Sequence, residues 1–213
     1  MQAGLLVGIA RMAREAEPLE AKARVRYGEL DARSLLNRCS GGRVPFDWTI
    51  NPYRGCELAC KYCYARYTHE FMELREPEDF ERLIFAKRLD LARFVRELRQ
   101  VRPHDWIAIG TATDPYQPAE RRYGRTRAVL GVFAGRSGFH LVLTTKSDLI
   151  ARDSALLAAI AGRNRLRVSI TVTTMDHELA RAVEPLAPRP ELRMRAVEAL
   201  SRAGIDTGVF ASP

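Results

Sequence analysis

The sequence contains no long apolar run. Although 46% of its 213 residues are hydrophobic, no stretch approaches the roughly 18 residues that a membrane-spanning helix needs. The apolar patch Leu5–Val7 has no basic residue before it and no convincing cleavage site after it, so the pattern of a signal peptide is also missing. We therefore expect no membrane partner and a cytoplasmic location.

Cysteine is scarce as well. Of the four cysteines, Cys56, Cys60 and Cys63 lie within eight residues, and Cys39 is separate. Cysteines this close in a chain without an export signal usually bind metal rather than form disulfides. An iron–sulfur cluster and a zinc ion with Cys39 as fourth ligand are the two alternatives, although zinc sites normally use two well-separated pairs of ligands.

The net charge is +8, and most of the 34 basic residues are arginine. A basic balance can mark a nucleic-acid partner, but it concerns association rather than fold. The densest basic run is Arg121–Arg127, within which Tyr123 could stack on a base. The alternative is that this run is the solvated start of a helix.

Short apolar strands alternate with helical patterns from residue 44 onward, and residues 1–43 form a separate, partly helical N-terminal extension in this interpretation. The predicted strands are Trp48–Ile50, Arg82–Ala86, Trp106–Gly110, His140–Leu143, Leu166–Val172 and Asp206–Phe210. Apolar residues at helical spacing lie between most of them. The alternation predicts an α/β fold of parallel strands with right-handed crossovers, as an open sheet or a barrel.

Polar residues follow the apolar part of nearly every predicted strand. They are Lys87, Thr111, Thr113, Asp114, Thr144–Ser147, Thr171, Thr173, Thr174 and Ser212. In a parallel α/β barrel these strand ends converge on one face, where the active site lies. Their recurrence favours a barrel-like arrangement.

The spacing from Cys56 to Cys63 is C-x3-C-x2-C. Thiolates are the usual ligands of a [4Fe–4S] cube, and three cysteines in one loop can hold three of its four irons. The fourth iron is then open to a small molecule, just as catalytic metal sites keep a free position.

With Tyr62 as the aromatic residue, the segment resembles the C-x3-C-x-aromatic-C signature of the radical S-adenosylmethionine (SAM) superfamily. Longer motifs are similar to those of the spore photoproduct lyase-like family, and the similarity runs from about Val44 to the end. These motifs are Asn51–Cys56, Tyr64–Arg66, Thr68–Glu70, Gly110–Glu120 and Thr145–Ser147.

The resemblance implies a partial (β/α)6 barrel of parallel strands with a [4Fe–4S] cluster on Cys56, Cys60 and Cys63. It implies that SAM binds the open iron and is cleaved to a 5′-deoxyadenosyl radical, which abstracts a hydrogen from the substrate. A reducing partner such as a flavodoxin or ferredoxin would supply the electron. A nucleic-acid substrate is expected by analogy. A non-catalytic module, in which an Fe–S or zinc centre supports a nucleic-acid-binding surface, is the alternative.

By position in these motifs, Thr113, Lys146 and Ser169 resemble residues that contact SAM. Asp114 and Glu120 belong to the same motifs, but the sequence assigns them no role.

Two departures qualify the resemblance. The lyase has a hydrogen-donating cysteine on its third strand, whereas here Thr111 is near that place and Gly110–Asp114 contains no cysteine, so repair of thymine dimers by the same mechanism is not expected. The chain also ends within the sixth predicted strand, so we expect a core domain, residues 44–213, that is truncated there.

Overall fold

The computed structural model describes residues 17–21, 25–39, 42 and 44–211, so Ser212 lies outside the described part. The strands are β1 (Glu17–Ala21), β2 (Arg26–Leu30), β3 (Leu36–Arg38), β4 (Trp48–Ile50), β5 (Tyr53–Arg54), β6 (Leu83–Lys87), β7 (Trp106–Ile109), β8 (His140–Thr145), β9 (Arg165–Thr171) and β10 (Asp206–Phe210). The helices are η1 (Tyr64–Met72), α2 (Asp79–Arg82), α3 (Leu91–Glu97), η2 (Leu98–Gln100), α4 (Ala119–Tyr123), α5 (Arg125–Ala134), η3 (Asp148–Asp153), α6 (Ser154–Ala161), α7 (His177–Val183) and α8 (Pro190–Arg202). All six predicted strands are present, as β4, β6, β7, β8, β9 and β10.

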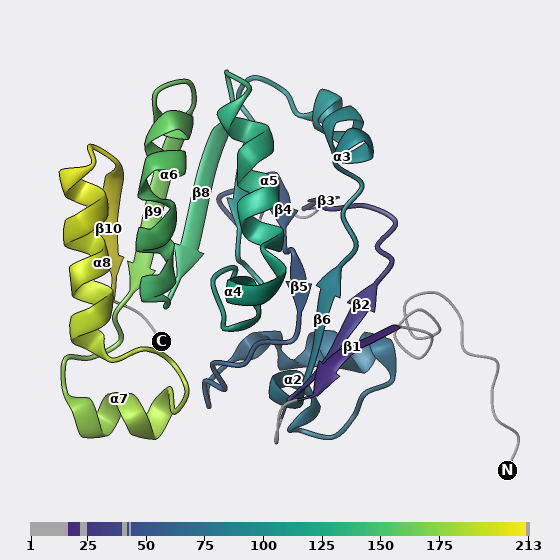
Figure 1. Ribbon diagram of the computed structural model, residues 1–213, viewed down its shortest axis with the longest axis vertical. Helices are drawn as coiled ribbons and strands as arrows, with labels where there is room; N and C mark the ends of the chain where they lie inside the picture. Colours follow the sequence, from purple (N-terminus) through teal and green to yellow (C-terminus); the bar gives the residue numbers. More distant parts are fainter. Residues whose placement is uncertain (1–16, 22–24, 40–41, 43, 212–213) are drawn as a thin grey trace, which may run out of the picture.

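The larger sheet has the order β10-β9-β8-β7-β4-β3. Its neighbours are parallel except at the edge, where β3 pairs antiparallel with β4. Helices α8 and α6 lie in front of β10 and β9, and α5 lies beside α6 on the same side of the sheet (Figure 1). The expected α/β class with parallel strands is therefore confirmed.

The core lies between this sheet and its helices. Strand residues such as Leu143 and Val168 pack in one cluster with Phe133 of α5 and Leu157 of α6. Burying each such side chain contributes roughly 1.5–3 kcal/mol, which fixes the strand ends relative to one another. The longest helix of the described part, α8, has 13 residues, and no helix there has the length and apolar character for crossing a bilayer.

The smaller sheet, of order β1-β2-β6-β5, contains one of the six predicted strands, β6. The chain turns out of the larger sheet after β4, because Pro52 has no N–H to continue a ladder. The Pro52 carbonyl instead accepts a hydrogen bond of 3.0 Å from the Lys87 N–H. β5 then pairs antiparallel with one edge of β6, and β2 pairs parallel with the other. The barrel wall therefore continues through this bend rather than through six parallel neighbours.

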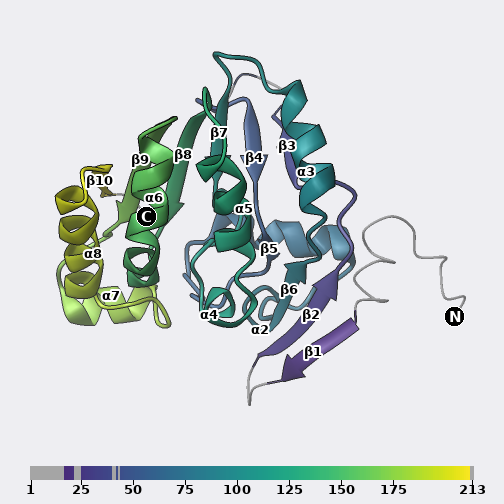
Figure 2. The ribbon, with the colours of Figure 1, turned by 45° about the horizontal axis from the view of Figure 1, so that its top comes forward.

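The segment expected to be a partly helical extension supplies strands in its described part. β2 pairs with β6 and β3 pairs with β4, so both strands belong to the same wall as the predicted core. Figure 2 shows β1 and β2 beside β6, at the edge of the molecule away from β10. These strands have three to five residues each, too few for a periodicity to be recognised.

Candidate active site

The cysteine loop follows β5 and is fastened by hydrogen bonds from within the protein. The Cys56 N–H donates to the Phe80 carbonyl at 2.8 Å. The Glu57 N–H donates to Gln117 Oε1, and Gln117 Nε2 donates back to the Gly55 carbonyl, each at 3.0 Å. Gly55 has φ +77°, and a Cβ there would lie 2.6 Å from a backbone carbonyl oxygen. Only glycine fits immediately before Cys56.

A cavity of about 440 Å³ lies beside this loop, a volume in the range of small-molecule sites. Its walls are formed by Val44, Phe46, Cys56, Leu58, Cys60, Tyr62, Cys63, Tyr64, Ala65, Gly110–Asp114, Thr144–Lys146, Thr171 and Phe210. Cys56 and Cys60 are buried and Cys63 is half-buried. Cys39 is not on this wall, and its thiol lies beside Thr49 and Asp47.

The donor set on this wall fits an iron–sulfur cluster. Burial raises the pKa of Cys56 and raises that of Cys60 to about 11, while the positive charge of Lys146 opposes the effect on Cys60. Within the described ranges, no three His, Cys, Asp or Glu side chains surround a point where a single ion could bind. Zinc requires four ligands around one ion, whereas a cube gives each thiolate a different iron. Cys56, Cys60 and Cys63 line this wall and Cys39 does not, so the wall offers three thiols, the number that suits the cube.

Lys146 follows β8 and is held by a buried carboxylate. Its Nζ lies 5.6 Å from the centre of the Tyr62 ring and 3.8 Å from Glu184 Oε1. Glu184 also accepts hydrogen bonds from the Tyr62 hydroxyl and from Thr173 Oγ1, and it pairs with Arg193 at 2.6 Å. Burial would raise the pKa of Glu184, but these partners lower it below its ordinary value. The carboxylate is therefore charged, and it holds both Lys146 and the cysteine loop.

Asp114 joins the loops that follow β7 and β8. Its Oδ1 accepts hydrogen bonds from Thr145 Oγ1 at 2.6 Å and from the Tyr116 N–H at 2.8 Å, and its Oδ2 accepts one from the Lys146 N–H at 2.7 Å. Burial raises the pKa of Asp114, and these three hydrogen bonds oppose that shift. Asp114 thereby places Thr113 and Lys146 on the same wall.

Of the three residues expected to contact SAM, two line the cavity and one does not. Thr113 and Lys146 line the cavity. Ser169 is half-buried on β9, in register with Thr144, and does not line it. Thr171, two residues further along the same face of β9, does.

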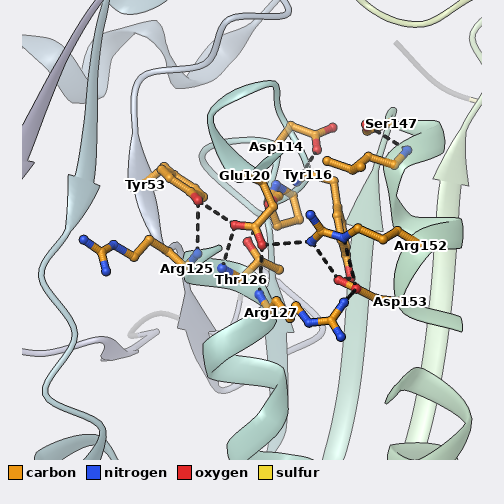
Figure 3. A network of polar contacts seen from close by, with 12 residues as sticks. Tyr53, Asp114, Tyr116, Glu120, Arg125, Thr126, Arg127, Ser147, Arg152 and Asp153 are labelled. Carbon is orange, nitrogen blue, oxygen red and sulfur yellow. Dashed lines mark hydrogen bonds and ion pairs between the residues drawn. The ribbon is translucent and has the colours of Figure 1, made fainter. Parts of the chain in front are cut away.

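Glu120 does not line the cavity, and it belongs to a network of polar contacts (Figure 3). Its Oε2 accepts hydrogen bonds from the Tyr53 hydroxyl at 2.5 Å and from the Thr126 N–H at 2.8 Å. Its Oε1 accepts from the Arg127 N–H at 3.0 Å and pairs with Arg152 at 3.3 Å. The first N–H groups of a helix have no partner within the helix, so Glu120 caps α5 and has a structural role.

The basic run Arg121–Arg127 is engaged within the chain. Arg125 pairs with Glu29 of β2, and Arg127 pairs with a buried aspartate. Tyr123 packs edge-on against another tyrosine ring, with centroids 5.5 Å apart. These contacts occupy arginine side chains and an aromatic ring that nucleic-acid binding would require. They therefore favour the structural interpretation of this run.

Sequence reasoning did not identify Glu184 or Arg193. Both lie between β9 and β10, in a region without a motif. A buried arginine and glutamate close in sequence could have indicated an ion pair, but the contact with Tyr62 spans 122 residues.

The chain is similar in sequence to a known superfamily and to individual proteins. The family model described as the radical SAM superfamily matches residues 50–212. An uncharacterized protein of Mycobacterium tuberculosis (strain ATCC 25618 / H37Rv) is 37% identical over 193 residues, which cover 89% of this chain and 56% of that protein. An uncharacterized protein of Methanocaldococcus jannaschii is 29% identical over 173 residues, covering 78% of this chain and 60% of that protein.

The fold of this chain is also similar to that of solved structures. Spore photoproduct lyase complexed with dinucleoside spore photoproduct superposes with a TM-score of 0.64 at 19% identity, covering 88% of this chain and 51% of the lyase. A mutant of the lyase with bound AdoMet and the same dinucleoside gives 0.61 at 18% identity, with coverages of 86% and 50%. The chain thus spans about half the length of the proteins it matches.

Proposed function

Because this chain belongs to the radical SAM superfamily, we propose that it cleaves SAM reductively and uses the resulting radical to abstract a hydrogen from a substrate. One observation carries the proposal: Cys56, Cys60, Cys63 and Lys146 line a single cavity of about 440 Å³. When bound, a [4Fe–4S] cluster supplies the electron that splits SAM into methionine and a 5′-deoxyadenosyl radical.

In this proposal Cys56, Cys60 and Cys63 hold the cluster as thiolates. Lys146 faces the carboxylate of SAM, because an ammonium donor forms a charge-assisted hydrogen bond with a carboxylate. Thr113 supplies a hydroxyl from the adjoining wall. Ser169 completes the proposed set from the same face of β9 as the cavity residue Thr171. Apolar wall residues limit the access of water. This exclusion is needed because a reactive radical must be protected from side reactions.

Replacing Lys146 by alanine is expected to weaken SAM binding by about 1–3 kcal/mol, the scale of a lost hydrogen bond to a charged group. Iron content should stay unchanged, because the cysteines are intact. Equilibrium binding of SAM to the reconstituted protein measures the effect. Lys61→Ala is the matched control, since Lys61 is an exposed lysine of the cysteine loop. Normal SAM affinity in Lys146→Ala would remove this residue from the proposal.

The substrate class is also proposed. The structural neighbour is complexed with a dinucleoside photoproduct, and this supports a nucleic-acid-related substrate here. Thr111 is near the place where the lyase has its hydrogen-donating cysteine, so in this proposal the step that follows abstraction differs from that of the lyase. A flavodoxin or ferredoxin as reductant and a cytoplasmic location stay predictions.

Formation of 5′-deoxyadenosine tests the proposal directly. The chain is reconstituted anaerobically with iron and sulfide, reduced with dithionite and incubated with SAM. We expect 5′-deoxyadenosine and methionine in equal amounts, even without the substrate. A fully reconstituted protein that yields neither would support the alternative, a non-catalytic nucleic-acid-binding module.

A further inference from the structure

Two positive side chains project from one face of the smaller sheet. In the β5–β6 register, Arg54 lies opposite Phe85, and residues opposite each other in an antiparallel pair project to the same face. Lys87 is two residues beyond Phe85 in β6, so it projects to that face as well. Phe85 packs there with Met72 of η1. Arg54 and Lys87 are therefore neighbours on the face that η1 covers.

Neither side chain has a partner among the described residues. Lys87 is 5% exposed and Arg54 is half-buried, yet within the described ranges no hydrogen bond or ion pair involves either side chain. Burial, and after it the charge of Arg54, lower the pKa of Lys87 to about 7. Two basic side chains without a hydrogen-bonded or ion-paired partner among the described residues therefore lie side by side in a poorly hydrated position.

The acid that attracts Lys87 is Glu97, and its carboxylate is already engaged. Glu97 Oε2 accepts hydrogen bonds from the N–H groups of Leu35 and Leu36 at 3.2 and 3.3 Å. Its Oε1 pairs with Arg93 at 3.3 Å. Glu97 therefore holds the start of β3 and does not neutralise the pair.

A third group nearby is also incompletely satisfied. The His69 ring lies 6.3 Å from the Phe85 ring, and its Nε2 is 3.0 Å from the Leu83 carbonyl oxygen. Its Nδ1 is buried and has no hydrogen-bond partner in the part of the chain that the structure describes. Burial lowers the pKa of His69, and Arg54 lowers it further. This face therefore carries polar side-chain groups for which the described residues provide no hydrogen-bond partner.

From this geometry we propose that Arg54 and Lys87 bind an anionic group of the substrate, a phosphate or a carboxylate. The inference rests on the proposed function, since strand ends of such a barrel open on the active-site face. Neither residue lines the cavity that holds Lys146, so the pair would serve an anion other than the SAM carboxylate. A buried charge is costly unless it is paired, and an oxyanion can accept from both the guanidinium fork and the ammonium group.

Thermal unfolding of the reconstituted 213-residue chain tests the site. Inorganic phosphate and acetate are compared with sodium chloride at matched ionic strength, and the anion with the larger effect distinguishes phosphate from carboxylate. We expect the preferred anion to raise the melting temperature of the wild type. Lys87→Met should melt about 2–4 °C higher than the wild type in sodium chloride alone, because an uncompensated charge is removed, and it should lose the anion-specific gain.

Arg54→Gln should lose the same gain, and it keeps the test decisive if Lys87→Met does not fold. Arg88→Gln is the matched control, because Arg88 is 51% exposed and pairs with Glu29 and Asp31; its gain should persist. An equal gain in the wild type and both site variants, or no gain in the wild type, overturns the proposal. The readout does not require SAM cleavage, so a wild type that forms 5′-deoxyadenosine but shows no gain refutes this site alone.

Discussion

Replacing Cys56, Cys60 or Cys63 by alanine is expected to remove the bound iron and the brown colour of the reconstituted protein. In the proposed cluster each thiolate would hold one iron of the cube, and loss of one would leave an iron without a protein ligand beside a wall that includes Leu58 and Ala65. Iron should fall from about four per chain to background, and 5′-deoxyadenosine formation should fall with it. Iron and sulfide analysis and the visible spectrum measure the change.

Cys39→Ala is the control for these variants, because the Cys39 thiol lies beside Thr49 and Asp47 and away from the cavity wall. It should keep its iron and its colour. A zinc site with Cys39 as fourth ligand predicts the opposite, namely metal loss in Cys39→Ala. Retention of iron in Cys56→Ala would contradict the three-cysteine assignment.

Glu120→Ala is expected to be the most destabilising substitution in the network of Figure 3. Glu120 is fully buried while Arg152 is 32% exposed, so the main cost comes from the Tyr53 hydroxyl and the first N–H groups of α5, which lose their acceptor. Each unsatisfied buried group costs about 1–3 kcal/mol, and we expect about 3–5 kcal/mol in total. For a chain of this size the melting temperature should fall by about 6–20 °C. Thermal unfolding followed by circular dichroism measures it.

Glu198→Ala is the matched control, since Glu198 forms an exposed pair with Arg202 one turn away on α8. Pairs of this kind contribute about 0.3–0.5 kcal/mol, so its melting temperature should change little. If Glu120→Ala melted like the wild type while losing SAM cleavage, Glu120 would be a site residue and the capping role would be wrong.

The features that could be predicted from the sequence depend on neighbouring residues. Strands such as β8 and β9 are buried apolar runs with clear alternation, and the cysteine spacing lies within one loop. Resemblance to known motifs then identified the superfamily, which the family model confirms. In physical terms, short-range patterns carry this information because each side chain's burial follows from its own position in a strand or loop.

The features that were missed depend on distant contacts. The smaller sheet exists because β2 and β5 find opposite edges of β6, and β5 has only two residues. Glu184 reaches Tyr62 across 122 residues. Asp114 and Glu120 lie six residues apart in one motif, yet one joins two loops and the other caps a helix. Their roles follow from which strands and helices meet, and local spacing does not contain that information.

The fastening of the cysteine loop has a consequence for how the metal is acquired. The Phe80 and Val183 carbonyls accept hydrogen bonds from the N–H groups of Cys56 and Lys61. Together with the two hydrogen bonds of Gln117, they hold the loop at both ends through protein groups. In a zinc finger, by contrast, metal binding supplies the folding free energy and the apoprotein is unfolded. Because protein hydrogen bonds order the loop here, we expect the chain to fold without the metal and to take up iron in a separate step. A chelator should therefore leave behind a folded apoprotein that can be reloaded.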